Sequence, residues 1–258
     1  MDSRIDKQSL FKFRPKSYKR GRRIAGIGAI INSAISAAEF QQMTMGFTEL
    51  RIQNREILYL FENLLSRNPR SYKKNIGKLL KNNGYVDQNN AHIECEGSIL
   101  QRKRLAFESI FKMRNLEHFD SLSNRFAGTK TLGIQVRGTD KHNEIAPVRL
   151  ERLFELVHEF IEKYEIENIF LATDDEYYYE ELRQKFGNKV TRNLEHTISM
   201  NGKPLHLNLR RRQINREMLE DVYVLSKCPY FLYSFSNVSH LALIMGAGDF
   251  TRIKCLNN

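Results

Sequence analysis

The chain has 258 residues, of which 41% are hydrophobic and 28% charged, the composition of an ordinary globular protein. With 14 glycines, 5 prolines and 3 cysteines, it is not a collagen-like fibre, a low-complexity chain or a disulfide-rich miniprotein. Residues 1–23 hold nine Lys/Arg against two Asp, so this segment contributes +7 of the net charge of +11. We interpret it as a basic leader. Because no zinc-finger, homeodomain or RNP signature accompanies the charge, we expect no nucleic-acid ligand.

The cysteines and the longest apolar stretch bear on location. Cys95, Cys228 and Cys255 are odd in number and lack C-x-x-C spacing, which indicates neither a disulfide framework nor a zinc site. The stretch 24–38 follows basic residues as a signal anchor would, but it is shorter than the roughly 20 residues that span a bilayer. We expect a cytoplasmic protein without a membrane span, in which this stretch forms a buried strand-turn-helix. A signal peptide is the alternative.

Few elements are predicted in the first half of the chain. The segment after Gly26-x-Gly28 has alanines at 34, 37 and 38, which suit a helix packed closely on a sheet and ending at Gly46. Residues 47–52 resemble a strand. Apolar residues at 57, 58, 60, 61, 64 and 65 have the spacing of an amphipathic helix. Residues 101–119 predict another helix, and the polar stretch 120–130 is the expected domain boundary.

Beyond residue 130, strands and helices alternate. Short apolar runs predict strands at 131–136, 168–173, 189–192 and 230–235. Helices are expected over 150–164 with Pro147 in the first turn, after the acidic residues 174–176, over 219–226, and from an N-cap at Ser236 to Met245. Residues 194–214 predict a long loop. This alternation predicts an α/β fold with helices on both faces of a parallel sheet.

Ligands of such sheets bind beyond the carboxyl ends of the strands, and polar residues follow three of the predicted strands. Arginine, lysine, serine hydroxyls and a helix N-terminus can bind phosphate, whereas the acids can bind hydroxyls or act as a base. A loop salt bridge is the alternative role for the first group and helix capping for the second. The three groups are Gln135, Arg137, Asp140 and Lys141; Asp174 and Asp175; and Ser234, Ser236 and Asn237.

Three motifs resemble, in order and spacing, those of the α1,6-fucosyltransferases, including bacterial members that modify chitin oligosaccharides, and more loosely those of protein O-fucosyltransferases. They are VRGTDK at 136–141, IFLATDD at 169–175 and LEDVYVLSKCPYFLYSFSNVSHLA at 219–242. Gly26-Ile-Gly28 is similar to the first loop of the family's N-terminal domain. The resemblance covers roughly residues 131–245 well and the first half weakly.

The resemblance implies a GT-B-like fold of two facing Rossmann-like domains with parallel sheets. An acceptor domain over 24–125 would contain the loop of Gly26 and Gly28, and a nucleotide-sugar-binding domain would cover 126–258. The implied activity is inverting transfer of fucose or a related sugar from a nucleotide-diphosphate donor to a glycan hydroxyl, without a metal or other cofactor.

The family's site residues can be matched to this sequence. Arg137 matches the arginine that binds the donor β-phosphate. Glu144 is the expected general base, although it lies one residue closer to the motif than in the family, and Asp140 is the alternative. The remaining residues implied in donor binding are Gln135, Lys141, Asp174, Asp175, Asp221, Ser234, Ser236 and Asn237.

The sequence departs from the family pattern at two positions. Gln135 stands where the family usually has a histidine associated with the nucleotide, and Gly138 stands where it has a second arginine. Without that arginine, either the arginines at 210–212 contact the diphosphate or the donor is another nucleotide sugar, such as a UDP-pentose. A non-catalytic nucleotide- or sugar-binding module, which needs phosphate contacts but no base, is a further alternative.

Overall fold

The computed structural model of the chain describes residues 12–13, 31–32, 34–36, 38–39, 51–52, 61–63, 97–138, 147–199 and 211–257. The chain divides into two compact units. The N-terminal unit comprises Met1–Glu94 and Arg102–Arg114, and the C-terminal unit comprises Cys95–Gln101 and Asn115–Asn258. The predicted acceptor and donor roles of two domains stay predictions.

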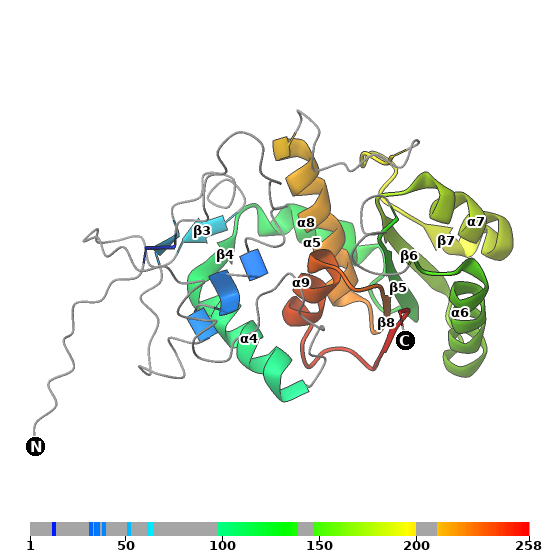
Figure 1. Cartoon of the computed structure of the whole chain (residues 1–258), viewed down its shortest axis with the longest axis horizontal. Helices are drawn as coiled ribbons and strands as arrows, with labels where there is room; N and C mark the ends of the chain where they lie inside the picture. The colour runs from blue at the N-terminus through cyan, green and yellow to red at the C-terminus, as the bar shows by residue number, and fades with distance from the viewer. Residues whose placement is uncertain are drawn as a thin grey trace, which may run out of the picture. The chain divides into compact units, whose positions relative to one another are not determined.

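The C-terminal unit is built on a five-stranded parallel sheet in the order β7-β6-β5-β8-β9 (Figure 1). In the paired register, Val136 of β5 lies opposite Thr173 of β6, and Gln135 lies opposite Tyr233 of β8. The three central strands therefore end at nearly the same level. The strands are β5 (Thr131–Val136), β6 (Asn168–Thr173), β7 (Val190–Thr191), β8 (Tyr230–Tyr233) and β9 (Arg252–Cys255).

Helices lie on both faces of this sheet (Figure 1). One face carries α6 (Leu150–Tyr164) and α7 (Glu176–Phe186). The other carries α5 (Leu116–Asn124), α8 (Arg211–Lys227) and α9 (Asn237–Met245). The α/β class with a parallel sheet is thus confirmed.

Alternation along β5 divides its side chains between the two faces. Leu132, Ile134 and Val136 join the core beneath α6, where burial of each aliphatic side chain contributes about 1.5–3 kcal/mol. On the other face, a Cβ added to Gly133 would lie 3.1 Å from Leu225 Cδ2 of α8. Glycine at 133 therefore lets α8 approach the sheet closely.

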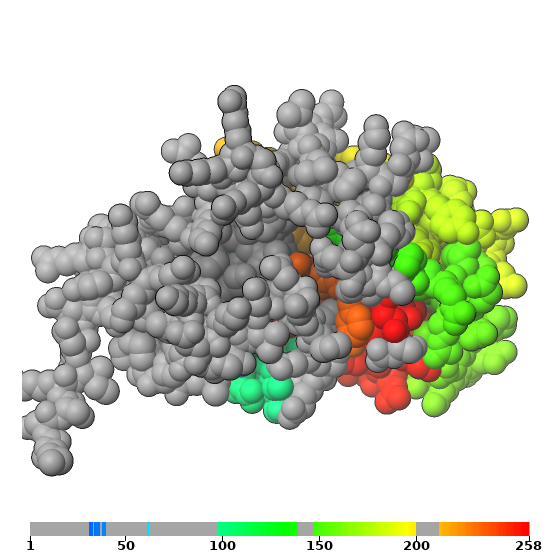
Figure 2. Space-filling model, viewed as in Figure 1, coloured from blue at the N-terminus to red at the C-terminus, as the bar shows by residue number. Residues whose placement is uncertain are grey.

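The last strand, β9, lies at the edge of the sheet beside β8. On the face drawn in Figure 2, the C-terminal segment in red lies against the green atoms of α6, and Lys254 Nζ is 2.9 Å from Glu159 Oε2. The sequence did not predict this strand, because RIKC alternates charged and apolar residues over only four positions.

The described part of the N-terminal unit has a small aromatic core. β3 (Phe61–Asn63) pairs antiparallel with β4 (Phe111–Met113), and the rings of Phe61 and Phe111 lie 4.8 Å apart between centroids. Phe107 of α4 (Gly97–Ile110) contacts both rings. β1 (Lys12–Phe13) pairs in parallel with β2 (Arg51–Ile52). The helix predicted after Gly28 is confirmed at the described residues among 31–39, whose apolar members are buried.

Two predictions for the first half are wrong. Residues 61–63, expected within a helix, form a strand because Phe61 packs on aromatic residues far away in the sequence. The single helix expected over 101–119 is two helices, because β4 pairs with β3 and Asn115 adopts a left-handed conformation with φ 54°. The second helix, α5, runs to Asn124 and so occupies part of the expected boundary.

In the second half, β5, β6, α6 and the helix from Ser236 to Met245 are confirmed. Pro147 lies before α6 and not in its first turn, because the N-cap Arg149 is still extended, with φ −75° and ψ 135°. The strands expected at 189–192 and 230–235 are shorter than predicted. The helix expected over 219–226 already begins at Arg211, since polar side chains in its first half pack against a polar loop.

Candidate functional site

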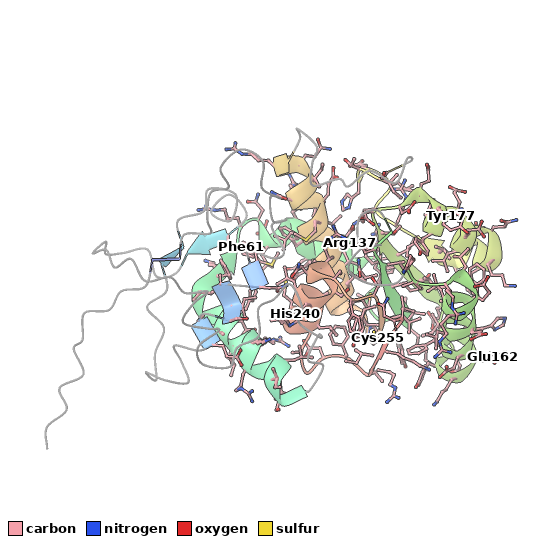
Figure 3. The ribbon with its side chains drawn as sticks, in the orientation of Figure 1. Phe61, Arg137, Glu162, Tyr177, His240 and Cys255 are labelled. Carbon is pink, nitrogen blue, oxygen red and sulfur yellow. The ribbon has the colours of Figure 1, made fainter. Side chains whose placement is uncertain are left out.

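The strand order reverses between β5 and β8, which are neighbours in the sheet although β6 and β7 separate them in sequence. Ligands of open parallel sheets bind at such a switch point, beyond the carboxyl ends of the strands. Arg137 follows β5 here, and its backbone N–H donates to Ser234 Oγ, which follows β8, at 3.1 Å. Figure 3 labels Arg137 at this edge of the sheet. The structure therefore brings two of the three predicted groups together.

Beneath this edge lies a buried serine–glutamine cluster, formed by Gln135, Ser234, Ser236 and Ser239. The Gln135 side-chain carbonyl accepts hydrogen bonds from the hydroxyls of Ser234 at 3.0 Å, Ser236 at 3.1 Å and Ser239 at 2.5 Å. The Gln135 residue is 4% exposed. Its carbonyl thus fixes the turn from β8 into α9, and a direct contact of Gln135 with a donor stays a prediction.

α9 begins at this turn. Ser236 is its N-cap, as predicted, and the Ser236 Oγ accepts a hydrogen bond from the backbone N–H of Ser239 at 3.0 Å. Asn237 is the first residue of the helix. The backbone N–H groups and partial positive charge of a helix N-terminus favour an anion, so this end of α9 suits a phosphate.

The acidic pair after β6 makes two different contacts. Asp175 caps α7, because its Oδ1 accepts a hydrogen bond from the backbone N–H of Tyr177 at 3.1 Å, which confirms the capping interpretation for this residue. Asp174 Oδ1 accepts from the backbone N–H of Gly138 at 2.9 Å. Asp174 therefore joins the end of β6 to the residue beside Arg137, and all three predicted groups lie along one edge.

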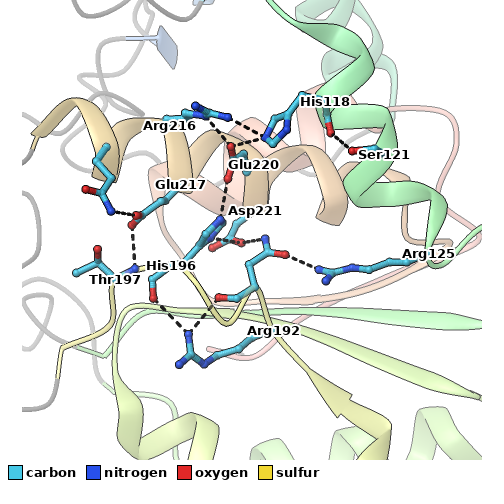
Figure 4. Close-up of polar contacts among 12 residues, drawn as sticks. His118, Ser121, Arg125, Arg192, His196, Thr197, Arg216, Glu217, Glu220 and Asp221 are labelled. Carbon is cyan, nitrogen blue, oxygen red and sulfur yellow. Dashed lines mark hydrogen bonds and ion pairs between the residues drawn. The ribbon is translucent and has the colours of Figure 1, made fainter.

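Asp221 belongs to a separate α8–loop network, defined by His196, Glu217, Glu220 and Asp221 (Figure 4). The three acids lie at positions i, i+3 and i+4 of α8, on the side that meets residues 192–199. Glu217 accepts from the backbone N–H of Thr197 at 2.9 Å, and Glu220 Oε2 lies 2.8 Å from His196 Nε2.

The basic side chains around Glu220 determine its pKa. Burial alone would raise the pKa of Glu220, but His196, His118 and Arg216 outweigh it and lower that pKa to about 2. The predicted role of Asp221 in donor binding stays a prediction, and His196, Glu217 and Glu220 were not predicted from the sequence. The usable signal was the acidic i, i+3, i+4 repeat, which is typical of a helix facing cations or donors.

The remaining predicted residues lie outside the part of the chain that the structure describes. They are Asp140, Lys141 and Glu144 after Arg137, the loop residues Gly26 and Gly28, and Arg210. Of the three arginines at 210–212, only Arg212 has a described side chain, which is exposed in the first turn of α8.

Among the described residues, no three or more His, Cys, Asp or Glu side chains gather into a group that could hold a metal ion. None of the described helices combines the length and apolar character needed to cross a membrane.

Comparison with known proteins places the fold. No protein-family model and no curated protein matches the sequence. NodZ α1,6-fucosyltransferase co-crystallised with GDP is similar in structure, with a TM-score of 0.53, 17% identity, and 90% of this chain and 92% of that chain covered. Selenomethionine NodZ from Bradyrhizobium gives a TM-score of 0.52 at 17% identity, covering 90% and 91% of the two chains. A variant of Arabidopsis thaliana FUT1 in complex with GDP gives 0.51 at 12% identity, covering 90% and 68%.

The chain has a fucosyltransferase-like fold. The predicted GT-B-like fold class is confirmed by these similarities and by the parallel sheet.

Within this fucosyltransferase-like fold, the structure gives a physical reason for glycine at position 138. A Cβ added to Gly138 would lie 2.4 Å from Asp175 Oδ2 and 2.5 Å from Asp175 Cβ, closer than atoms can approach. The side chain of Asp175 therefore occupies the space into which a side chain at 138 would extend.

Proposed function

We propose that the chain is a glycosyltransferase that moves fucose or a related sugar from a nucleotide-diphosphate donor to a glycan hydroxyl. One observation carries the proposal: at the switch point, Arg137 lies beside the turn that leads into the N-terminus of α9. The backbone N–H of Arg137 donates a hydrogen bond to Ser234 Oγ in that turn. A guanidinium can bind two phosphate oxygens at once, and a helix N-terminus adds further donors. Similarity in fold to NodZ, which has been soaked with GDP-fucose, supports a nucleotide-sugar donor.

The proposed reaction is a single displacement that inverts the anomeric carbon. The acceptor hydroxyl oxygen attacks that carbon, and the bond to the β-phosphate oxygen breaks with its electron pair staying on the nucleoside diphosphate. Arg137 and the α9 N-terminus stabilise the charge of this leaving group, so the reaction needs no divalent ion. The hydroxyl proton passes to a carboxylate, for which we propose Glu144 first and Asp140 second.

The close approach of Asp175 to Gly138 favours one variation on this proposal. With a carboxylate beside the backbone where the family has a second arginine, the diphosphate loses one cationic contact. A donor other than GDP-fucose, such as a UDP-pentose, is therefore the second candidate. A panel of GDP- and UDP-sugars tested for binding and transfer decides between them.

The proposal is tested first at Arg137. Arg137→Lys keeps the positive charge but loses the two-pronged contact, so we expect kcat/KM for transfer to fall at least tenfold with an unchanged melting temperature. Arg152→Lys is the matched control, because Arg152 is a surface residue of α6 paired with Glu155 at 3.4 Å. Equal activity of both variants would remove Arg137 from the site, and unfolding of Arg137→Lys alone would assign it a structural salt bridge.

Substitution of Glu144 tests the proposed general base. Glu144→Gln should lower the transfer rate by roughly two orders of magnitude with little change in donor affinity. Normal transfer by that variant together with an inactive Asp140→Asn would move the base to Asp140.

Transfer should persist in EDTA; activity lost in EDTA and restored by Mn²⁺ would contradict metal independence. Donor binding without any transfer across the panel would instead favour a non-catalytic binding module.

A further inference from the structure

The segment 192–199, between β7 and α8, contacts two other parts of the protein. The first is α8, where Glu217 accepts from the backbone N–H of Thr197 at 2.9 Å. The second is the β6–α7 turn. There the backbone N–H of Ser199 donates to the carbonyl of Asp174 at 3.0 Å, and Ser199 in turn accepts from the N–H of Glu176 at 3.2 Å. The segment thus links α8 to the candidate site.

His196 makes the side-chain contact that holds this segment on α8. Its Nε2 lies 2.8 Å from Glu220 Oε2 and its Nδ1 lies 3.0 Å from Asp221 Oδ1, while its side chain is only 12% exposed. A neutral imidazole has one N–H, whereas an imidazolium has two. Nε2 is within hydrogen-bond distance of Glu220, whereas Nδ1 is within ion-pair distance of Asp221 but makes no hydrogen bond with it; two carboxylates this close to the ring favour the cation.

Other charged groups surround this pair from each neighbouring element. From α8, Arg216 Nε lies 2.8 Å from Glu220 Oε1, and from α5, His118 Nε2 lies 2.7 Å from the same oxygen. Within the segment, Arg192 donates to the carbonyl of His196 at 3.3 Å. After α5, Arg125 donates to Asn193 Oδ1 at 2.5 Å.

Asn193 in turn donates to Asp221 Oδ1 at 2.7 Å. Together with Glu217, these groups surround His196 with cations and carboxylates, and the set contains two histidines, His196 and His118.

Asp174, the residue reached by Ser199, contacts the candidate site directly. Its Oδ1 accepts from the backbone N–H of Gly138, the residue after Arg137. An unbroken series of contacts therefore runs from Glu220 and Asp221, through His196 and Ser199, to the backbone beside Arg137.

We propose that His196 is a positioning residue, whose protonated ring holds the segment 192–199 on α8 and thereby keeps Asp174 and the backbone at Gly138 in place for donor binding. The part about the donor rests on the proposed function, and the part about the segment does not. Burial alone would lower the pKa of His196, but Asp221 and Glu220 outweigh it and raise that pKa to about 9. The ring is therefore charged at neutral pH and loses its proton in the alkaline range.

Hydrogen exchange on the full chain tests the segment without using activity. In wild type, the protection factors of the backbone amides of Thr197, Ser199 and Glu176, corrected for intrinsic exchange rates, should be at least tenfold lower at pH 10 than at pH 7. The same amides in His196→Gln should lack this protection at both pH 7 and pH 10. His158→Gln is the matched control, because His158 is an exposed histidine of α6 that faces Glu162 at 3.6 Å. Unchanged protection at Ser199 and Glu176 in both wild type at pH 10 and His196→Gln would overturn the proposal.

Titration with GDP and UDP, measured by calorimetry, tests the link to the site. For whichever nucleotide wild type binds, the affinity should fall as the pH rises through the alkaline range. His196→Gln should weaken the affinity about fivefold or more at pH 7 and should show no such alkaline loss. Equal affinity and an equal pH profile for the two proteins would overturn the positioning role. If neither nucleotide binds wild type, the proposed function fails, and the exchange experiment still decides the role of His196 at Ser199 and Glu176.

Discussion

Two buried polar clusters of the C-terminal unit are built on opposite principles. The serine–glutamine cluster at the end of β5 and β8 is neutral, with one amide carbonyl accepting from three hydroxyls. The α8–loop network is ionic, with Glu220 shared by three cationic or ionisable donors. The neutral cluster holds its geometry at any moderate pH, whereas the ionic network holds a loop only while its partners keep their charges. Both support the same edge of the sheet.

The largest effect should come from removing the shared carboxylate. Glu220→Gln leaves the buried His196 without one of its two counter-charges, and removing one partner of a buried ion pair costs about 3–5 kcal/mol. Urea denaturation at pH 7 measures the change. Glu155→Gln, on the exposed side of α6, is the control and should stay within roughly 0.5 kcal/mol of wild type. A loss for Glu220→Gln no larger than that of the control would show that the network adds no stability.

The second prediction uses pH. Because the pKa of His196 is raised from 6.5 to about 9, its contribution is complete below pH 6.5 and is lost as the pH rises through about 9. The pKa of Glu220 is lowered from 4.5 to about 2, so its contribution is complete above pH 4.5 and is lost as the pH falls through about 2. Urea denaturation should show the unfolding free energy falling by on the order of 3 kcal/mol between pH 6.5 and 10. His196→Gln should flatten that decline, and an equally steep decline in the variant would assign it to other groups.

The stability contributed by the serine–glutamine cluster should depend on the Gln135 carbonyl acceptor and should not depend on pH. Gln135→Met removes the carbonyl and leaves the hydroxyls of Ser234, Ser236 and Ser239 to find other partners, at a cost of about 2 kcal/mol. The difference from wild type, measured by urea denaturation at pH 6, 7, 8 and 9, should be the same throughout. A difference that changes with pH would show that the cluster contains a titrating group.

The smallest effect is expected at the contact between the strand ends. Gly138→Ala places a Cβ against Asp175 and should cost about 1–2 kcal/mol, because the side chain and α7 must shift. In an Asp175→Gly background the same change should cost less, with a coupling of at least about 0.5 kcal/mol in the double-mutant cycle. Strict additivity would mean that the two positions do not contact each other.

Much of the C-terminal unit could be predicted because its elements are locally encoded. NIFLAT is a continuous apolar run that is buried on both faces, and Ser236 is a preferred N-cap residue directly before a helix. β3 could not be predicted, because Phe61 lies in a helical apolar pattern and becomes a strand only through contacts with Phe107 and Phe111.

In the candidate site, too, some residues could be predicted from local sequence, whereas others depend on contacts between distant segments. Arg137 and Asp174 follow predicted strands, so topology places them together. His196 lies in a loop without a regular pattern, and Glu217, which contacts the same loop, lies in the polar first half of α8, before the helix that was predicted over 219–226. Ionic packing of a helix on a loop leaves little trace in hydrophobic periodicity, which is why periodicity did not predict this network.

The contact between Asp175 and Gly138 also restricts how this protein can change during evolution. A residue with a Cβ at 138 forces Asp175 to shift, because the carboxylate and its Cβ fill that space. Replacing Asp175 first removes the N-cap of α7, which carries its own cost. The two positions are therefore epistatic, and no single substitution leads without penalty from this sequence to one with an arginine at 138. Descendants of this chain are expected to keep glycine at 138 for as long as they keep the cap.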